Sequence, residues 1–168
     1  MIARYKSTLL YILLIVAVNY GFTVVPLVKL PDGTLWPPMS LVVGFIFVVR
    51  DFAQREIGHK VLLAMLVGAA LSYVMAAPYV AIASATAFLV SELMDWLIYS
   101  VTKRPLSQRI LYSSLLATPI DSAVFLFGIG HLSLVGVLTM TASKLIGALI
   151  VWWLIRRRET QSVSRAAV

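Results

Sequence analysis

The feature that most constrains this chain is a succession of long apolar runs separated by short basic segments. The runs cover residues 8–28, 39–49, 61–75, 79–100, 110–130 and 133–155. A membrane-spanning helix needs about 20 apolar residues, and in lipid each span must satisfy its own backbone hydrogen bonds. The runs are continuous rather than alternating, which disfavours a β-barrel. The sequence therefore predicts an all-α, polytopic membrane protein with six transmembrane helices.

Composition supports lipid as the solvent of this chain. Of its 168 residues, 61% are hydrophobic and only 12% are charged, whereas about a quarter of a soluble domain is charged. We expect a single transmembrane domain over 1–158 and a short polar cytoplasmic tail over 159–168. There are no cysteines, and His59 and His131 lie at predicted loop edges. We therefore expect no metal site and no cofactor.

The basic side chains predict how the chain is oriented. Twelve of the fourteen lie in the N-terminal segment, around the second and fourth loops, and in the tail. Lys29 alone is on the other side, and Lys144 lies inside a run. Lys and Arg concentrate in cytoplasmic loops, so we expect both termini in the cytoplasm and a location in the inner (plasma) membrane. The same pattern accounts for the net charge of +7 without a nucleic-acid partner.

The second run is unusually short, and its continuation is charged. Its eleven apolar residues end at Val49, and no break signal appears before Gly58. Two interpretations stay open. Either the span ends near Val49 and a polar extension follows, or the helix continues to Gly58 and protein shields its charged half. The polar residues of that half are Arg50, Asp51, Gln54, Arg55 and Glu56.

Four charged side chains fall well inside later runs. A charge at the bilayer centre costs about 3 kcal/mol on insertion scales, so such groups are expected to face one another or a cavity. Helical spacing places them on polar faces that comprise Ser84, Phe88, Ser91, Glu92, Asp95 and Tyr99 in the fourth run, Ser114, Thr118, Asp121, Ser122 and Phe125 in the fifth, and Gly136, Met140, Ser143, Lys144 and Gly147 in the sixth. Burying these faces together predicts a polar interior at mid-membrane depth.

The charges in that interior do not balance, because three carboxylates face Lys144 alone. Either a carboxyl group is protonated, or Arg50 reaches in, or a cationic group of a ligand completes the set. A purely structural alternative is a buried ion pair that holds the bundle together, formed by Lys144 with Asp121 or Glu92. Intramembrane ionisable groups are functional by default. No Ser–His dyad, HExxH or GxSxG pattern is present, so we expect no enzyme.

Five polar motifs resemble those of the queuosine-precursor transporter family, also called the vitamin uptake transporter family. In order, they are Asn19-Tyr20, Arg50-Asp51-x-x-Gln54-Arg55-x-x-Gly58, Ser91-Glu92-x-x-Asp95-x-x-x-Tyr99, Asp121-Ser122-x-x-Phe125 and Lys144. The resemblance implies import of a 7-deazaguanine such as 7-cyano-7-deazaguanine. The chain departs from the family in its short second span and in Ala117-Thr118-Pro119, where members carry a glycine.

A guanine-like edge offers N–H donors to carboxylates and a carbonyl to Lys144 or Asn19, and its ring can stack on aromatic side chains. The expected substrate-binding residues are Asn19, Phe88, Glu92, Asp95, Tyr99, Asp121, Phe125 and Lys144, with Trp96 as a further stacking candidate. We expect Pro119 to break the fifth span and free a carbonyl near the ligand. The expected cytoplasmic gate comprises Arg50, Asp51, Gln54 and Arg55, with an Asp51–Arg55 ion pair.

Two other functions remain open from the sequence. One is a substrate-binding subunit of a vitamin importer that partners with an ATPase module, which would dock on small residues of the first and third spans. The other is a membrane scaffold that transports nothing. For the favoured reading, the expected partners are a small-molecule substrate and the lipid bilayer, and a homodimer is left open.

Overall fold

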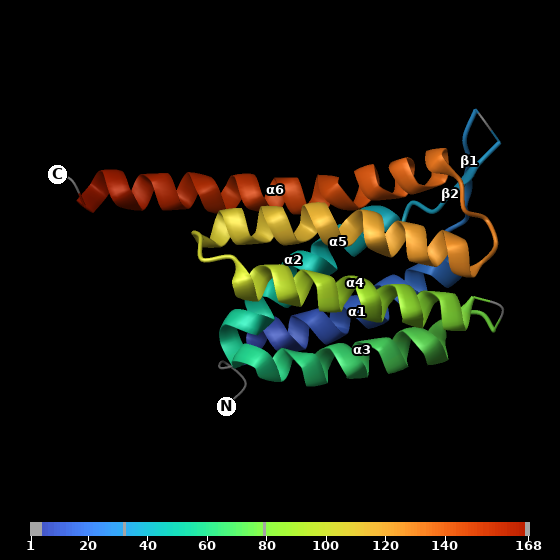
Figure 1. Cartoon of the computed structure of the whole chain (residues 1–168), viewed down its shortest axis with the longest axis horizontal. Coiled ribbons are helices and arrows are strands. Elements are labelled where there is room, and N and C mark those ends of the chain that lie inside the picture. The colour runs from blue at the N-terminus through green and yellow to red at the C-terminus, as the bar shows by residue number, and fades with distance from the viewer. Residues whose placement is uncertain (1–4, 32, 79, 167–168) are drawn as a thin grey trace.

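The computed structural model describes residues 5–31, 33–78 and 80–166, with side chains described as far as Arg158. These residues form helices that lie lengthwise beside one another (Figure 1). In chain order the elements are α1 (Lys6–Val24), β1 (Val28–Lys29), β2 (Leu35–Trp36), α2 (Ser40–Ile57), the 3₁₀ turn η2 (Gly58–Lys60), α3 (Val61–Met75), α4 (Ala81–Val101), α5 (Leu106–Gly128) and α6 (Leu134–Ala166). The prediction of an all-α protein is confirmed.

Five stretches of the described chain are long and apolar enough to cross a membrane. They are Lys6–Val24, Ser40–Met75, Ala81–Val101, Leu106–Gly128 and Leu134–Arg158. The second of them contains α2, η2 and α3, and the chain reverses direction at η2 (Figure 1). The fifteen residues of α3 extend about 22 Å at 1.5 Å per residue. Six crossings therefore require α3 to span as a short helix, and the six-span count stays a prediction.

Helix α2 is the central element of the bundle, because it contacts α1, α3, α4, α5 and α6. It runs without interruption to Ile57, so the interpretation that the second helix ends near Val49 is wrong. The helix stops at Gly58, whose φ of +61° is readily adopted only by glycine. The helix that carries the buried Arg50 and Asp51 is thus packed against all the other long helices, as the cost of intramembrane charge requires.

Glycines allow α2 and α6 to approach closely. A Cβ atom on Gly44 would overlap the backbone carbonyl of Lys144. One on Gly147 would lie 3.1 Å from the Phe45 ring and 3.2 Å from the Leu41 carbonyl oxygen. Small residues at helix contacts let backbones pack tightly inside membranes. Gly44 therefore fixes where the Lys144 backbone sits against α2.

The end of α2 also caps the start of α1. The Glu56 carboxylate accepts hydrogen bonds from the backbone N–H groups of Ser7 (3.1 Å) and Thr8 (2.9 Å), and from the Thr8 hydroxyl (2.9 Å). A carboxylate satisfies the unpaired N–H groups of a helix N-terminus and complements its dipole. This contact ties α1 to the central helix at one end of the bundle.

The outward surfaces are apolar, as a lipid-facing bundle requires. Helix α4 exposes Val90, Leu93 and Leu97. On α3, large exposed side chains include Leu63 and Val74. The buried face of α4 instead carries mainly small and polar residues, and that of α3 combines Val61 and Met65 with Gly68 and Ser72.

Several boundaries differ from the sequence-based expectations. Helix α1 ends at Val24 rather than near 28, because Val28–Lys29 pairs with Leu35–Trp36 in an antiparallel hairpin that was not predicted. Pro119 does not break the fifth helix, since α5 is continuous through it. Helix α6 continues through the predicted tail to Ala166. Asp32 in the first loop, Tyr79 at the expected start of the fourth span, Arg4 and the side chain of Arg165 lie outside the described part of the chain.

The two ends of the bundle differ in charge. The start of α1, η2, the 102–105 loop and the last part of α6 lie at one end, and the β1–β2 hairpin lies at the other (Figure 1). We call the first the basic end. The described basic residues at or near it are Lys6, Arg55, Lys60, Lys103, Arg104, Arg109, Arg156, Arg157 and Arg158. The hairpin end carries Lys29. The basic end is the expected cytoplasmic side.

Candidate functional site

A buried ionic cluster lies where α2 meets α4. Arg50 in α2 pairs through Nη1 with Asp51 Oδ1 (2.9 Å) and through Nε with Glu92 Oε2 (3.3 Å). Its Nη2 pairs with Asp95 Oδ2. All four side chains are at most 1% exposed. We call Arg50, Asp51, Glu92 and Asp95 the Arg50 cluster.

Neutral polar side chains from four helices enclose this cluster. Gln54 Oε1 accepts a hydrogen bond from Arg50 Nη1 (2.6 Å), and Gln54 Nε2 donates to Ser100 Oγ (2.8 Å). Tyr11 donates from its hydroxyl to Glu92 Oε2 (3.0 Å). The hydroxyl of Ser113 donates to Asp51 Oδ2 (3.2 Å). The cluster therefore joins α1, α2, α4 and α5.

The Arg50 cluster adds a cation to the interior but also a fourth carboxyl group, so two cations face four carboxyl groups there. Of the three alternatives, the one in which Arg50 reaches into the carboxylates is found. The predicted Asp51–Arg55 ion pair is wrong. Asp51 points inward and pairs with Arg50, while the Arg55 side chain is exposed at the last turn of α2. Positions i and i+4 share a side of a helix, but here Arg50 and Ser113 engage the Asp51 carboxylate in the interior.

A second ionic contact joins α5 to α6. Lys144 Nζ lies 2.6 Å from Asp121 Oδ2 and donates a hydrogen bond to Ser122 Oγ (2.9 Å). Asp121 Oδ1 accepts from Ser91 Oγ of α4 (2.9 Å). The side chain of Lys144 is 2% exposed, whereas that of Asp121 is 13% exposed. We call Lys144 and Asp121 the Lys144 pair.

The two ionic groups are linked through adjacent residues of α4. We call the Lys144 pair, Ser91 and the Arg50 cluster together the polar column. Ser91, which bonds to Asp121, directly precedes Glu92 of the Arg50 cluster on α4. On α5 the hydroxyls of Ser114 and Thr118 are buried and have no hydrogen-bond partner among the described residues. The same holds for Glu92 Oε1. Buried polar atoms without partners are costly, so a concentration of them beside two ionic groups marks this region as a binding site candidate.

Residues 37–157 match a family model that is described as "putative vitamin uptake transporter". The chain belongs to the vitamin uptake transporter family. The match extends over most of the chain and includes both the Arg50 cluster and the Lys144 pair. No curated protein and no solved structure matches the chain.

Family membership confirms the resemblance that the motifs carried, and it places this vitamin uptake transporter among transporters rather than enzymes. Together with five stretches able to cross a membrane, it makes the chain a multi-pass membrane protein. The inner membrane is the usual location of such transporters.

The remaining predicted site residues of the transporter are dispersed. Asn19 Nδ2 donates to the Ile15 carbonyl (2.8 Å) and to Ser72 Oγ (3.2 Å), which links α1 to α3. Phe88 belongs to the apolar core between α1, α3 and α4, where its ring lies against Gly68. Phe125 lies one helical turn beyond Asp121 on α5.

Two aromatic candidates lie toward the basic end. Trp96 donates from Nε1 to His59 Nδ1 (3.3 Å), and the two rings meet edge to face. The ring of Tyr99 is covered by the Arg109 guanidinium at 3.7 Å. Arg109 also donates from Nε (3.0 Å) and Nη2 (2.6 Å) to the Tyr99 carbonyl. Among the described residues, neither Trp96 nor Tyr99 therefore makes a polar contact with the Lys144 pair.

Four polar contacts of the site were missed by sequence reasoning. They come from Tyr11, Ser100, Ser113 and Trp36. Trp36 Nε1 donates to Ser143 Oγ (2.8 Å) beside Lys144. A signal for Tyr11 was available, because a buried tyrosine hydroxyl needs a partner and Tyr11 shares the inward face of α1 with Ile15 and Val18. Trp36 lies outside the apolar runs, and its role depends on the hairpin.

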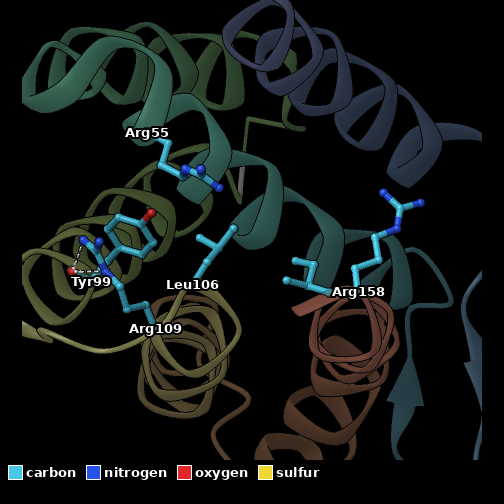
Figure 2. Close-up of a pocket in the computed structure, with 6 residues that line it drawn as sticks. Arg55, Tyr99, Leu106, Arg109 and Arg158 are labelled. Carbon is cyan, nitrogen blue, oxygen red and sulfur yellow. Dashed lines mark hydrogen bonds between the residues drawn. The ribbon is translucent and has the colours of Figure 1, made fainter. Parts of the chain in front are cut away.

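A separate cavity of about 470 Å³ opens at the basic end (Figure 2). Residues of α2, α4, α5 and α6 line it: Arg55, Tyr99, Leu106, Arg109, Ile155 and Arg158. Gln54, which belongs to the surroundings of the Arg50 cluster, directly precedes Arg55 on α2. The polar column thus continues from the Lys144 pair through the Arg50 cluster toward this cavity.

Proposed function

We propose that this transporter imports a queuosine precursor, 7-cyano-7-deazaguanine or a related 7-deazapurine, and binds it at mid-membrane beside the Lys144 pair. The observation that carries the proposal is the accessible Asp121 carboxylate held against a buried lysine. The unpartnered hydroxyls of Ser114 and Thr118 lie along the same helix. Family membership supports transport, and the motif resemblance supports the substrate class.

The chemistry of the pair suits a guanine-like edge. Such an edge presents two N–H donors next to a carbonyl acceptor. Asp121 supplies carboxylate oxygens to the donors, and Lys144 supplies an ammonium to the carbonyl, with the two groups 2.6 Å apart. Ser91 and Ser122 hold each partner from the other side. On this proposal the ring inserts at the pair and exchanges one ionic contact for charge-assisted hydrogen bonds.

Glu92 and Asp95 take part in a second step of the proposal. The Arg50 guanidinium presents adjacent N–H donors to them, as a guanine edge would. We assign Arg50, Asp51 and Gln54 to a gate that closes the column toward the basic end, with Arg55 at its mouth. Glu92, next to Ser91, is the residue through which occupancy beside Asp121 would reach the gate. Intramembrane charges at such positions mark substrate and ion pathways in transporters.

The proposed topology has six crossings with both termini in the cytoplasm. The basic end then faces the cytoplasm, in agreement with the distribution of Lys and Arg. The polar column leads from mid-membrane to that end. Import therefore ends with release past Arg50 into the cavity lined by Arg55 and Arg109.

The packing of α3 leaves an ATP-driven importer subunit as an alternative, because Ala70 is exposed although Gly68 and Ser72 are buried. The alternative requires small residues exposed for docking on α1 and α3. Gly68 instead lies against Ile15 and Phe88 inside the bundle, and Ser72 bonds to Asn19. These two small residues are used for internal packing.

Uptake of labelled 7-cyano-7-deazaguanine, measured in cells that cannot synthesise it, tests the proposal. We expect the Asp121→Asn, Lys144→Ala double variant to abolish uptake while the protein remains in the membrane at the wild-type level. A matched control is Lys103→Ala, which removes a lysine from an exposed loop. Equal uptake by the double variant and the wild type would exclude the Lys144 pair as the substrate site.

A further inference from the structure

In the proposed function the cavity at the basic end is only the exit toward the cytoplasm, and the chemistry of its lining has no ligand assigned. Its charged lining residues are Arg55, Arg109 and Arg158, and no described carboxylate lines it. The other lining residues are Leu106, Ile155 and Tyr99. A hollow with several guanidinium groups and an apolar floor is suited to an anion that carries a hydrocarbon portion.

Tyr99 provides an independent sign of a ligand. The residue is 2% exposed, and its hydroxyl has no hydrogen-bond partner among the described residues. Figure 2 shows that this hydroxyl lies on the side of the ring that faces Arg55. Arg109 covers the ring and is held by the Tyr99 carbonyl. The cavity therefore offers a buried O–H donor between two guanidinium groups.

The position of the cavity along the helices matches the level of lipid headgroups. Just before Ile155 and Arg158 on α6 come Trp152 and Trp153, which pack under Arg156 (5.1 Å) and Arg157 (3.5 Å). Tryptophans followed by arginines typically mark the boundary between hydrocarbon and headgroups. A cavity at this level opens toward phosphates of the membrane.

We propose that this cavity binds the phosphate of an anionic phospholipid. The phosphate oxygens accept hydrogen bonds from Arg55, Arg109 and the Tyr99 hydroxyl, and the first acyl carbons lie against Leu106 and Ile155. Arg158 stands at the mouth, where its guanidinium points away from Tyr99 (Figure 2), and adds long-range attraction. Basic pockets between transmembrane helices on the cytoplasmic side bind such headgroups. The inference does not depend on which substrate is transported.

The test uses the full-length protein in nanodiscs of phosphatidylcholine with a minor fraction of phosphatidylglycerol. Native mass spectrometry measures how strongly phosphatidylglycerol is retained over phosphatidylcholine. We expect clear retention by the wild type and a loss of about fivefold for Arg55→Gln, since one basic residue near an anionic surface contributes about 1 kcal/mol. The control Arg104→Gln removes an exposed arginine from the same end without touching the cavity. Equal losses in both variants would overturn the proposal.

A second pair of variants separates a specific site from general attraction. Tyr99→Phe removes the unpartnered hydroxyl without changing charge, and Tyr112→Phe does the same at an exposed position of α5. We expect reduced retention in the first variant and wild-type retention in the second. Millimolar inorganic phosphate should not displace the lipid. Displacement by inorganic phosphate would show that the cavity is a site for free phosphate rather than for a lipid, and equal retention by the two tyrosine variants would show that the Tyr99 hydroxyl binds no headgroup.

Discussion

The Arg50 cluster and the Lys144 pair are both ionic groups inside the same bundle, yet they are built differently. The cluster joins one guanidinium to three carboxyl groups, and further bonds come from Tyr11, Gln54 and Ser113. The pair joins one ammonium to one carboxylate and has serine hydroxyls as its neighbours.

The side chains of the two groups also differ in how exposed they are. Every side chain of the Arg50 cluster is at most 1% exposed, whereas the Asp121 side chain is 13% exposed. A group that is bonded from four helices rearranges only when several contacts break together. A one-to-one pair with accessible oxygens can exchange its contact for a ligand. The difference supports the proposal that the Arg50 cluster holds the bundle and closes the pathway, whereas the Lys144 pair binds the substrate.

The largest effect should come from removing Arg50. Arg50→Met leaves three buried carboxyl groups without their cation, and breaking a buried ion pair on one side costs about 3–5 kcal/mol. We expect a large drop in the thermal stability of the detergent-solubilised protein and in its yield. Arg55→Met, an exposed arginine five residues along α2, should behave like the wild type. Similar stability of the two variants would show that the buried contacts of Arg50 do not stabilise the bundle.

The Lys144 pair should respond differently to single and double replacement. Lys144→Met leaves Asp121 buried in part without a cation, and we expect a loss of unfolding free energy of about 2–3 kcal/mol. Adding Asp121→Asn removes the unpaired charge. The double variant should regain most of the lost stability, but it should not regain uptake. Thermal unfolding of both variants gives the stability readout. A double variant less stable than the single one would mean that the pair is held for stability rather than binding.

The close approach of α2 and α6 allows the backbone of the pair to be displaced selectively. Gly44→Leu introduces a side chain where the Lys144 carbonyl lies, and overpacking typically costs about 1–3 kcal/mol. We expect reduced stability together with reduced uptake, because α6 must move away from α2. Ala142→Leu places the same side chain on an exposed position of α6 and serves as the control. Unchanged uptake in Gly44→Leu would show that the position of Lys144 is not critical.

The smallest expected effect concerns the rim of the Arg50 cluster. Tyr11→Phe removes one hydrogen bond to Glu92, which is worth about 1 kcal/mol. Tyr20→Phe, at an exposed position of the same helix, provides the matched control. Thermal unfolding should separate the two variants by a few degrees. No difference between them would indicate that Tyr11 does not stabilise the cluster.

Helical spacing was sufficient to predict several parts of the site. Glu92 and Asp95 share a face because they are three residues apart, and they meet the same guanidinium. The pairing of Lys144 with Asp121 was expected as one alternative, because polar faces of separate spans avoid lipid by meeting one another. The all-α architecture followed from the length of the apolar runs.

Other features depended on tertiary packing that no local pattern encodes. The central position of α2 could not be read from its eleven apolar residues, because a short span with a polar extension has the same sequence pattern. Asp51 pairs with Arg50 rather than with Arg55, because Asp51 and Arg50 face the interior of the bundle and Arg55 is exposed. Phe88 joined an apolar core since Gly68 of α3 leaves room for its ring.

Calorimetric titration of 7-cyano-7-deazaguanine into the purified protein in nanodiscs tests the central claim most directly. Wild type, Asp121→Asn and Lys103→Ala should be compared at equal protein concentration, after confirming that all three elute as the same species. Binding by the wild type and by Lys103→Ala, with loss of binding in Asp121→Asn, is the predicted result. Wild-type affinity in Asp121→Asn would contradict the assignment of the Lys144 pair as the substrate site.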